Sequence, residues 1–369
     1  MPDPDRDAWA AADNVLAVRL DALGDVLMTE PAVRALTEAR PGRRVTLLTS
    51  PAGAAVAPLL PAVDEVIVYD APWMKATTPR ADARPECAMI DRIRRGRFDA
   101  AAIFTVYSQS PLPAALLCHL AGIPRRLAHC RENPYQLLTD WVPEPEPALS
   151  RHEVRRQLDL AAAVGGRTAD ERLRLCVPPE ATARAREALG WFGLEPGDRW
   201  AAVHVGASAP SRRYPPDLFA GAVRLMVREH GIAVVFTGGP AEVELVEQVR
   251  SRSGVFTHSL AGELDVAGLA AVLALAPVLV ANNTGPVHVA AAVGTPVVDL
   301  YALTNPQHTP WMVPCRVLNH DVPCRNCYKS VCPEGHQHCL ALVPPAAVAR
   351  AAAELIGETA SDRSGGRGS

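Results

Sequence analysis

The fold class is set by the stretch VLAVRLDALGDVLMTEPAVRALTEA, residues 15–39. Its first six residues, Val15–Leu20, are apolar apart from one arginine and are typical of a buried strand. A short turn follows at Asp21–Asp25, and the apolar spacing of Val26–Ala39 predicts a helix. Short β-branched runs alternate with helix-length segments along the rest of the chain, which is the pattern of βαβ units. The sequence therefore predicts an α/β fold with parallel sheets.

The expected elements form two series, each of which makes one Rossmann-like, doubly wound half. In the first half we expect strands at Val15–Leu20, Val45–Thr49, Glu65–Tyr69, Ala100–Phe104 and Arg126–Ala128, and helices near Val26–Ala39, Ala52–Leu60, Cys87–Arg95 and Pro113–Ala121. In the second half we expect strands at Ala201–Val205, Ala233–Thr237, Val278–Val280 and Val297–Leu300, and helices near Pro216–His230, Ala241–Arg252, Val266–Ala276 and Pro286–Val293. Ligands of such sheets bind at the carboxyl ends of the strands, so two facing halves predict a central cleft for two substrates.

The sequence also predicts how the chain is divided. The Pro/Glu run Val142–Pro147 and two helices, Arg151–Val164 and Pro179–Leu189, lie between the halves, and we place the boundary within residues 176–198, dividing the chain into 1–180 and 181–343. A last helix is expected at Pro344–Ile356. The Gly/Ser/Arg tail, residues 357–369, has too little apolar content to fold and is expected to be disordered.

Composition excludes several classes of protein. The 369 residues are enough for two or three domains, and 49% hydrophobic with 21% charged residues is ordinary globular usage. A net charge of -3, from 37 Lys and Arg against 40 Asp and Glu, gives no broad basic field, so nucleic-acid binding is disfavoured. The acidic N-terminus has no apolar signal region, and Val266–Ala281 is too short and too interrupted to span a membrane. We therefore expect a cytoplasmic protein.

The first candidate for chemistry is Asp25, in the turn between the first strand and its helix. A carboxylate at this position lies at the carboxyl end of a strand and could act as a general base toward a hydroxyl. The alternative is that Asp25 or Asp21 caps the helix. The turn holds one glycine and no G-x-G-x-x-G pattern, which argues against a nicotinamide dehydrogenase.

Three further strand-to-helix turns lie in the second half. The loop VGASAPSRRYP, residues 205–215, combines small residues with two arginines, whose guanidinium groups suit phosphate oxygens. The turn NNTGPVH, residues 282–288, opens a helix with Gly and Pro and is a ready anion site, with His288 on its first turn. In the turn TGGPAE, residues 237–242, Glu242 could bind a ribose. The alternatives are a solvated surface turn, a structural histidine and a glutamate favoured by the helix dipole, respectively.

Taken together and in their order along the chain, the four turns resemble glycosyltransferase family 9, the bacterial heptosyltransferases of lipopolysaccharide core assembly. The resemblance runs from Val15 to about Ile356. It implies a GT-B architecture: an N-terminal acceptor-side domain at 1–180, a C-terminal nucleotide-sugar donor domain at 181–343, and a C-terminal helix, Pro344–Ile356, that returns toward the first domain. It also implies inversion at the anomeric carbon without a metal, so that no cofactor is required for catalysis.

The resemblance assigns roles residue by residue. Asp25 matches the aspartate taken as the base that deprotonates the acceptor. The donor-binding positions are a phosphate-side hydroxyl, the arginine pair, a residue near the ribose and the diphosphate turn: Ser208, Arg212, Arg213, Glu242, Asn283, Thr284, Gly285 and His288. Two positions depart from the family: Arg212 is usually Lys, and Asn283 replaces the acidic residue that helps hold the donor sugar. Because an amide both donates and accepts, the identity of the donor sugar stays open.

A cysteine cluster late in the chain has spacing that metal sites use. The pattern Cys324-x2-Cys327-x4-Cys332-x6-Cys339 has His336 and His338 in its last interval. It predicts a structural Zn²⁺ site, with free or redox-active thiols and disulfides as the alternatives. The other five cysteines are scattered, which favours reduced thiols in a chain without a signal peptide.

The predicted function is an inverting, metal-independent glycosyltransferase that moves a heptose-type sugar from a nucleoside diphosphate donor, ADP-heptose first, to a hydroxyl of a glycan or glycolipid acceptor such as lipopolysaccharide. The alternatives are a transferase of a secondary metabolite or other surface glycan with a different donor, and a noncatalytic sugar-nucleotide-binding protein. A basic spot, Arg92, Arg94, Arg95 and Arg97, is either an exposed helix end or a contact with anionic lipid at the cytoplasmic face of the inner membrane.

Overall fold

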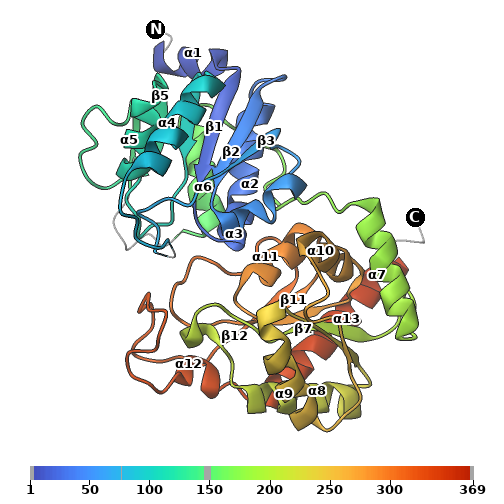
Figure 1. The fold of residues 1–369 in the computed structure, drawn as a ribbon. Coiled ribbons are helices and arrows are strands. Elements are labelled where there is room, and N and C mark those ends of the chain that lie inside the picture. Colours follow the sequence, from blue (N-terminus) through green and yellow to red (C-terminus); the bar gives the residue numbers. More distant parts are fainter. Residues whose placement is uncertain (1–3, 76, 145–150, 366–369) are drawn as a thin grey trace. The chain divides into compact units, whose positions relative to one another are not determined.

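The computed structural model describes residues 4–75, 77–144 and 151–365 of the chain (Figure 1). It divides into two compact units, Met1–Cys176 and Val177–Ser369. The division lies within the region predicted from the sequence, four residues before the expected position at 180. Each unit is described by itself below.

The first unit is a six-stranded parallel sheet covered by helices. Its strand order is β3-β2-β1-β4-β5-β6, and every neighbouring pair is parallel. The strands are β1 (Asn14–Arg19), β2 (Arg44–Thr49), β3 (Glu65–Val68), β4 (Ala100–Ile103), β5 (Arg125–Cys130) and β6 (Asp140–Pro143). The helices are α1 (Pro4–Ala11), α2 (Leu23–Glu38), α3 (Pro51–Ala54), α4 (Arg84–Gly96), α5 (Leu112–Leu120) and α6 (Glu153–Ala163), with a 3-10 turn at Ala57–Leu59.

The second unit repeats this order when β7 is taken as its first strand. Its sheet runs β12-β11-β10-β7-β8-β9, again all parallel. The strands are β7 (Trp200–His204), β8 (Ala233–Thr237), β9 (His258–Ser259), β10 (Leu279–Asn282), β11 (Val297–Leu300) and β12 (Cys315–Leu318). The helices are α7 (Pro179–Trp191), α8 (Pro216–His230), α9 (Val243–Ser253), α10 (Val266–Leu275), α11 (Gly285–Ala292), α12 (His338–Ala341) and α13 (Pro345–Gly365), with 3-10 turns at Pro210–Arg212 and Pro240–Glu242.

Both sheets have the doubly wound order, in which the chain adds strands first on one side of the first strand and then reverses to add them on its other side. That reversal lies between β1 and β4 in one unit and between β7 and β10 in the other. Buried aliphatic strands form the core, and β7 is buried along its whole length. Ligand sites of this architecture lie at the carboxyl ends of the strands beside the reversal.

The structure corrects two expectations about the chain's ends and links. Helix α13 continues to Gly365, so the disorder predicted from Gly357 is wrong for residues 357–365. Glu354 and Glu358 of this helix pair with Arg316 of β12, which ties the helix to the sheet. Residues 366–369 lie outside the described residues. Val142 and Pro143, the first two residues of the stretch predicted as a Pro/Glu link, belong to β6, which pairs with β5. Residues 145–147 of that stretch lie outside the described residues.

Helix α13 packs against α8 within the second unit. Its expected return toward the first domain stays a prediction. Among the described residues, we find no helix with the length and apolar character needed to cross a membrane.

Candidate functional site

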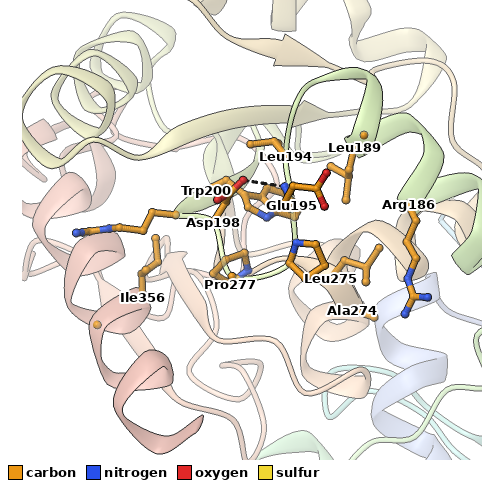
Figure 2. Close-up of a pocket in the computed structure, with 15 residues that line it drawn as sticks. Arg186, Leu189, Leu194, Glu195, Asp198, Trp200, Ala274, Leu275, Pro277 and Ile356 are labelled. Atoms are coloured by element: carbon orange, nitrogen blue, oxygen red, sulfur yellow. Dashed lines mark hydrogen bonds between the residues drawn. The ribbon is translucent and has the colours of Figure 1, made fainter. Parts of the chain in front are cut away.

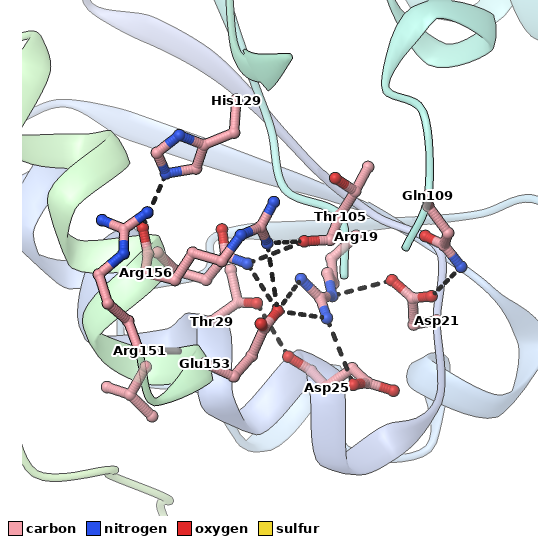
Figure 3. Close-up of polar contacts among 12 residues, drawn as sticks. Arg19, Asp21, Asp25, Thr29, Thr105, Gln109, His129, Arg151, Glu153 and Arg156 are labelled. Atoms are coloured by element: carbon pink, nitrogen blue, oxygen red, sulfur yellow. Dashed lines mark hydrogen bonds and ion pairs between the residues drawn. The ribbon is translucent and has the colours of Figure 1, made fainter. Parts of the chain in front are cut away.

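The turn that carries Asp25 is built around a buried arginine. Arg19 ends β1 with no solvent exposure, and its guanidinium contacts three carboxylates (Figure 3). Its Nε lies 3.0 Å from Oδ2 of Asp21, one terminal nitrogen lies 3.3 Å from Oδ1 of Asp25, and the other lies 3.0 Å from Oε1 of Glu153 on α6. The arginine therefore fixes the carboxylate of Asp25 at the start of α2.

Electrostatics in this cluster follow from burial. Burial raises the pKa of Asp21 to about 6, against the opposing field of Arg19. Burial alone would lower the pKa of Arg19, but the fields of Asp21, Glu153 and Asp25 outweigh it and raise that pKa. The guanidinium of Arg19 therefore stays charged. Because it faces three acidic side chains, the cluster has more acidic groups than cations.

Both sequence interpretations of Asp25 have a structural counterpart. Its Oδ2 accepts a hydrogen bond from the backbone N–H of Ala22, 3.2 Å away, which is the capping contact. Its other oxygen faces Arg19, and 17% of the side chain is exposed, so solvent or a substrate can reach it. Capping and base catalysis are thus compatible, and the catalytic role stays a prediction.

The turns of the second unit are joined by one asparagine. Asn282 ends β10, and its amide nitrogen donates to the carbonyl of Val205 at 2.8 Å. Its oxygen accepts from the backbone N–H of Tyr214 at 2.9 Å. One buried side chain therefore ties both ends of the arginine loop to the diphosphate turn. Asn282 was not among the predicted site residues, although it stands inside the NNTGP motif.

Glu242 is brought to the same place from the β8 side. Its Oε2 accepts from the N–H of Gly239 at 2.8 Å and lies 3.4 Å from Nε2 of His204. A Cβ on Gly206 would lie 1.6 Å from Oε1 of Glu242, so Gly206 is the residue that leaves room for this carboxylate. Burial lowers the pKa of His204, which Glu242 partly opposes. The structure thus brings the turns after β7, β8 and β10 into one site.

The arginine loop holds one half-buried arginine, Arg212, and one exposed arginine, Arg213. Nε of Arg213 donates to the carbonyl of Ala207 at 2.7 Å, which closes the loop on itself. Arg212 is half-buried, at the end of the 3-10 turn, and Ser208 is exposed. Ser211 between them is buried and donates to carbonyls of the cysteine segment, from its N–H to Ser330 at 3.0 Å and from its hydroxyl to Lys329 at 2.7 Å.

The diphosphate turn opens α11 as predicted. Thr284 is the N-cap residue, Gly285 is the first helical residue, and both are partly exposed. His288 on the first turn is buried, with 4% of its surface exposed. The N-terminus of this helix, which begins with partly exposed residues, suits an anion.

Asn283 turns inward. Its Nδ2 donates to Oδ2 of Asp299 on β11 at 3.0 Å and to the carbonyl of His308 at 2.8 Å. Asp299 is fully buried, and burial raises its pKa to about 8, although the bond from Asn283 lowers it. Asp299 is therefore a neutral carboxylic acid near pH 7. The sequence offered one signal for this pair, an aspartate inside an otherwise apolar strand.

The four clustered cysteines are near one another but do not form a coordination shell. Sγ of Cys324 lies 4.0 Å from Nε2 of His336, and the rings of His336 and His338 stack at 4.1 Å. Burial raises the pKa of Cys339, and the neighbouring thiols act in the same direction. Within residues 4–75, 77–144 and 151–365, no three His, Cys, Asp or Glu side chains are arranged to hold a metal ion. All nine cysteines are free thiols. A structural Zn²⁺ in this segment stays a prediction.

Two other features lie away from these turns. A cavity of about 700 Å³ lies between α7, α10 and α13, beside Trp200 at the start of β7, and none of the predicted site residues lines it (Figure 2). The basic spot on α4 is exposed, and Arg94 in it pairs with Asp91. Membrane contact at this spot stays a prediction.

Comparison with known proteins decides the family. The model of glycosyltransferase family 9 (heptosyltransferase) matches residues 87–338, more than half of the chain. The chain belongs to glycosyltransferase family 9. Lipopolysaccharide heptosyltransferase 1 of Pseudomonas aeruginosa is 28% identical over 328 residues, covering 86% of this chain and 87% of that protein. Lipopolysaccharide heptosyltransferase 2 of Escherichia coli is 26% identical over 308 residues, covering 80% and 84%.

Solved structures agree on the fold of this family 9 chain. The glycosyl transferase family 9 structure from Veillonella parvula has a TM-score of 0.77 at 22% identity, covering 94% of this chain and 97% of that one. E. coli ADP-heptose lipopolysaccharide heptosyltransferase II has a TM-score of 0.72 at 22% identity, covering 94% and 99%. The predicted family, the GT-B fold and the glycosyltransferase class are confirmed. Asp25 belongs to the first unit and the donor-turn residues belong to the second.

Proposed function

We propose that this family 9 glycosyltransferase moves a heptose-type sugar from ADP-heptose to a hydroxyl of a lipopolysaccharide-type acceptor, with inversion and without a metal. One observation carries the donor part of the proposal. The buried amide of Asn282 joins the arginine loop to the diphosphate turn, and Gly206 admits Glu242 to the same place. A nucleoside diphosphate needs such a set: a carboxylate for the ribose, and cations with backbone N–H groups for the phosphates.

In the proposed reaction the carboxylate of Asp25 removes the proton from the acceptor hydroxyl. The oxygen attacks the anomeric carbon from the face opposite the nucleoside diphosphate, whose bond to that carbon breaks with inversion. The charge that grows on the leaving diphosphate is met by Arg212, the N–H groups at Thr284–Gly285 and His288. Arg19 holds Asp25 in place while leaving part of the carboxylate exposed.

The donor is tested by calorimetric titration with ADP, UDP, GDP and dTDP in the presence of EDTA. Clear preference for ADP, undiminished by EDTA, supports the proposal, and turnover of ADP-heptose is then measured with lipopolysaccharide acceptors. Preference for another base moves the assignment to a different sugar donor. Absence of binding by all four favours a noncatalytic protein.

A structural zinc ion in the cysteine segment is a separate proposal, supported by the spacing of Cys324, Cys327, Cys332 and Cys339 and by their mutual proximity. Binding would require the thiols to close in from their present arrangement. Elemental analysis of freshly purified protein tests it, and well under one zinc per chain contradicts it.

A further inference from the structure

A small cavity opens beside the turn that carries the candidate base. It has a volume of about 260 Å³ and lies at the carboxyl ends of β1 and β4 in the first unit. These two strands flank the reversal of strand order, the position at which sheets of this kind bind ligands. None of the predicted site residues lines it.

The walls of the cavity differ in chemistry. One is apolar and includes Trp73, Met74, Phe104 and Pro113. Trp73 is half-buried, and its ring meets the edge of Tyr69 at a centroid distance of 5.7 Å and an angle of 70°. The indole is therefore held in one orientation by packing and offers a fixed surface to a ligand.

The polar wall is formed by Asp21, Thr105, Gln109 and Ser110. Nε2 of Gln109 donates to Oδ1 of Asp21 at 2.7 Å, and Arg19 holds the other oxygen of Asp21 (Figure 3). Within the described part of the chain, the side-chain oxygen of Gln109 accepts no hydrogen bond. The wall thus combines a carboxylate, an amide and a hydroxyl, which bind hydroxyl groups.

The charges around the cavity disfavour an anion. Asp21 is the one charged side chain among the described residues that line it. Behind it, the single guanidinium of Arg19 is shared by Asp21, Asp25 and Glu153. Arg131 lines a neighbouring cavity of about 280 Å³, together with Glu132, and does not line this one. A carboxylate or phosphate in the 260 Å³ cavity would face repulsion with no cation to pair with.

We propose that this cavity binds an uncharged sugar ring of the acceptor, with the apolar face of the ring on Trp73 and its hydroxyl groups on Asp21 and Gln109. The role as an acceptor subsite rests on the proposed function. The volume is just below the roughly 300–1,000 Å³ of common ligand pockets, so it suits a single ring. Asp21 shares Arg19 with Asp25, which brings this ring close to the candidate base.

The test uses two sugars of the same shape that differ in charge. Methyl glucuronoside and its uncharged amide, methyl glucuronamide, are titrated into the full-length protein and followed by ligand-observed NMR, and the pair is repeated in the manno series. The variants are Trp73→Ala, Gln109→Leu and, as a matched control, Trp141→Ala. Trp141 is an exposed tryptophan on β6 of the same unit and does not line the cavity. Circular dichroism checks that each variant is folded.

We expect an amide to bind at least about tenfold more tightly than its acid, since the acid is repelled by the carboxylate of Asp21 and meets no cation among the described residues that line the cavity. Trp73→Ala and Gln109→Leu should each weaken binding about tenfold or more, and Trp141→Ala should leave it unchanged. Equal or tighter binding of the acids, no effect of Trp73→Ala, or no binding of either amide at tens of millimolar overturns the proposal.

ADP titrations on the same samples separate the two proposals. Recognition of the uncharged sugars without any ADP binding would support the cavity's ligand and refute the donor chemistry. ADP binding without recognition of the uncharged sugars would overturn the cavity assignment alone.

Discussion

The buried acid beside the diphosphate turn gives a prediction about stability and pH. Asp299 has no solvent exposure, and within the described residues one hydrogen bond, from Asn283, reaches its carboxyl group. Replacing it by the isosteric Asn removes the titration while keeping an oxygen for Asn283 to bind. The variant Asp299→Asn therefore isolates the effect of the proton.

The sign and size follow from linkage. Burial raises the pKa of Asp299 to about 8 in the folded chain, whereas an unfolded aspartate has a pKa of about 3.9. Between these values the folded state keeps a proton that the unfolded state releases, so the free energy of unfolding falls as pH rises. The slope is about 1.4 kcal/mol per pH unit, which amounts to about 4 kcal/mol between pH 5 and pH 8. The variant loses this contribution to the pH dependence.

The assay is urea unfolding of wild type and Asp299→Asn across this pH range. Brief hydrogen-exchange labelling of β10 and β11 peptides, at one fixed labelling pH, reports the second unit alone. We expect the stability of the variant relative to wild type to rise steadily with pH, whatever its offset at pH 5. Asp321→Asn, a surface aspartate of the same unit, is the matched control. Parallel curves for wild type and Asp299→Asn, or a stability of the variant relative to wild type that falls as pH rises, would refute the reasoning.

Three predictions concern the proposed chemistry. Asp25→Asn keeps an acceptor for the Ala22 N–H but removes the base, so kcat should fall by about 10²–10⁴-fold with the Kd for ADP unchanged. A loss of ADP affinity as large as the loss of kcat would contradict the catalytic role. Gly206→Ala should displace the carboxylate of Glu242 and weaken ADP binding about tenfold. Calorimetry should show that the free energy of unfolding falls by only about 1 kcal/mol. Unchanged ADP affinity would exclude Glu242 from the site. Arg212→Ala should weaken ADP about tenfold or more and leave adenosine unaffected, and equal weakening of both ligands would contradict a phosphate contact.

Much of the fold could be predicted because its signals are local. Val297–Leu300 and Pro216–His230 have the bounds that apolar pattern and proline position indicate. The strands that were missed, β6, β9 and β12, are short and only partly buried, so their sequences do not alternate or form an apolar run. They exist because a neighbouring strand offers free backbone groups to pair with, and that is a tertiary cause.

The candidate site shows the same division between local and tertiary information. The turns could be predicted from the sequence because each begins where an apolar strand gives way to glycine, proline or charged residues. Their supports could not be found in this way. Glu153 comes from α6, 134 residues after Arg19, and Asp299 lies 16 residues after Asn283. Partners of this kind depend on how helices and strands pack, and a charged residue inside an apolar strand is the one trace they leave in the sequence.

The placement of Arg212 shows that the donor loop depends on the cysteine segment. The 3-10 turn at Pro210–Arg212 has only three residues and cannot be stable by itself. Both hydrogen bonds that Ser211 donates go to carbonyls of Lys329 and Ser330, between Cys327 and Cys332. Nε2 of Gln337 donates to the carbonyl of Pro210 at 3.1 Å. Any rearrangement of the thiols, by metal or by oxidation, would therefore shift the arginine proposed to bind the diphosphate, so metal content and ADP affinity should change together.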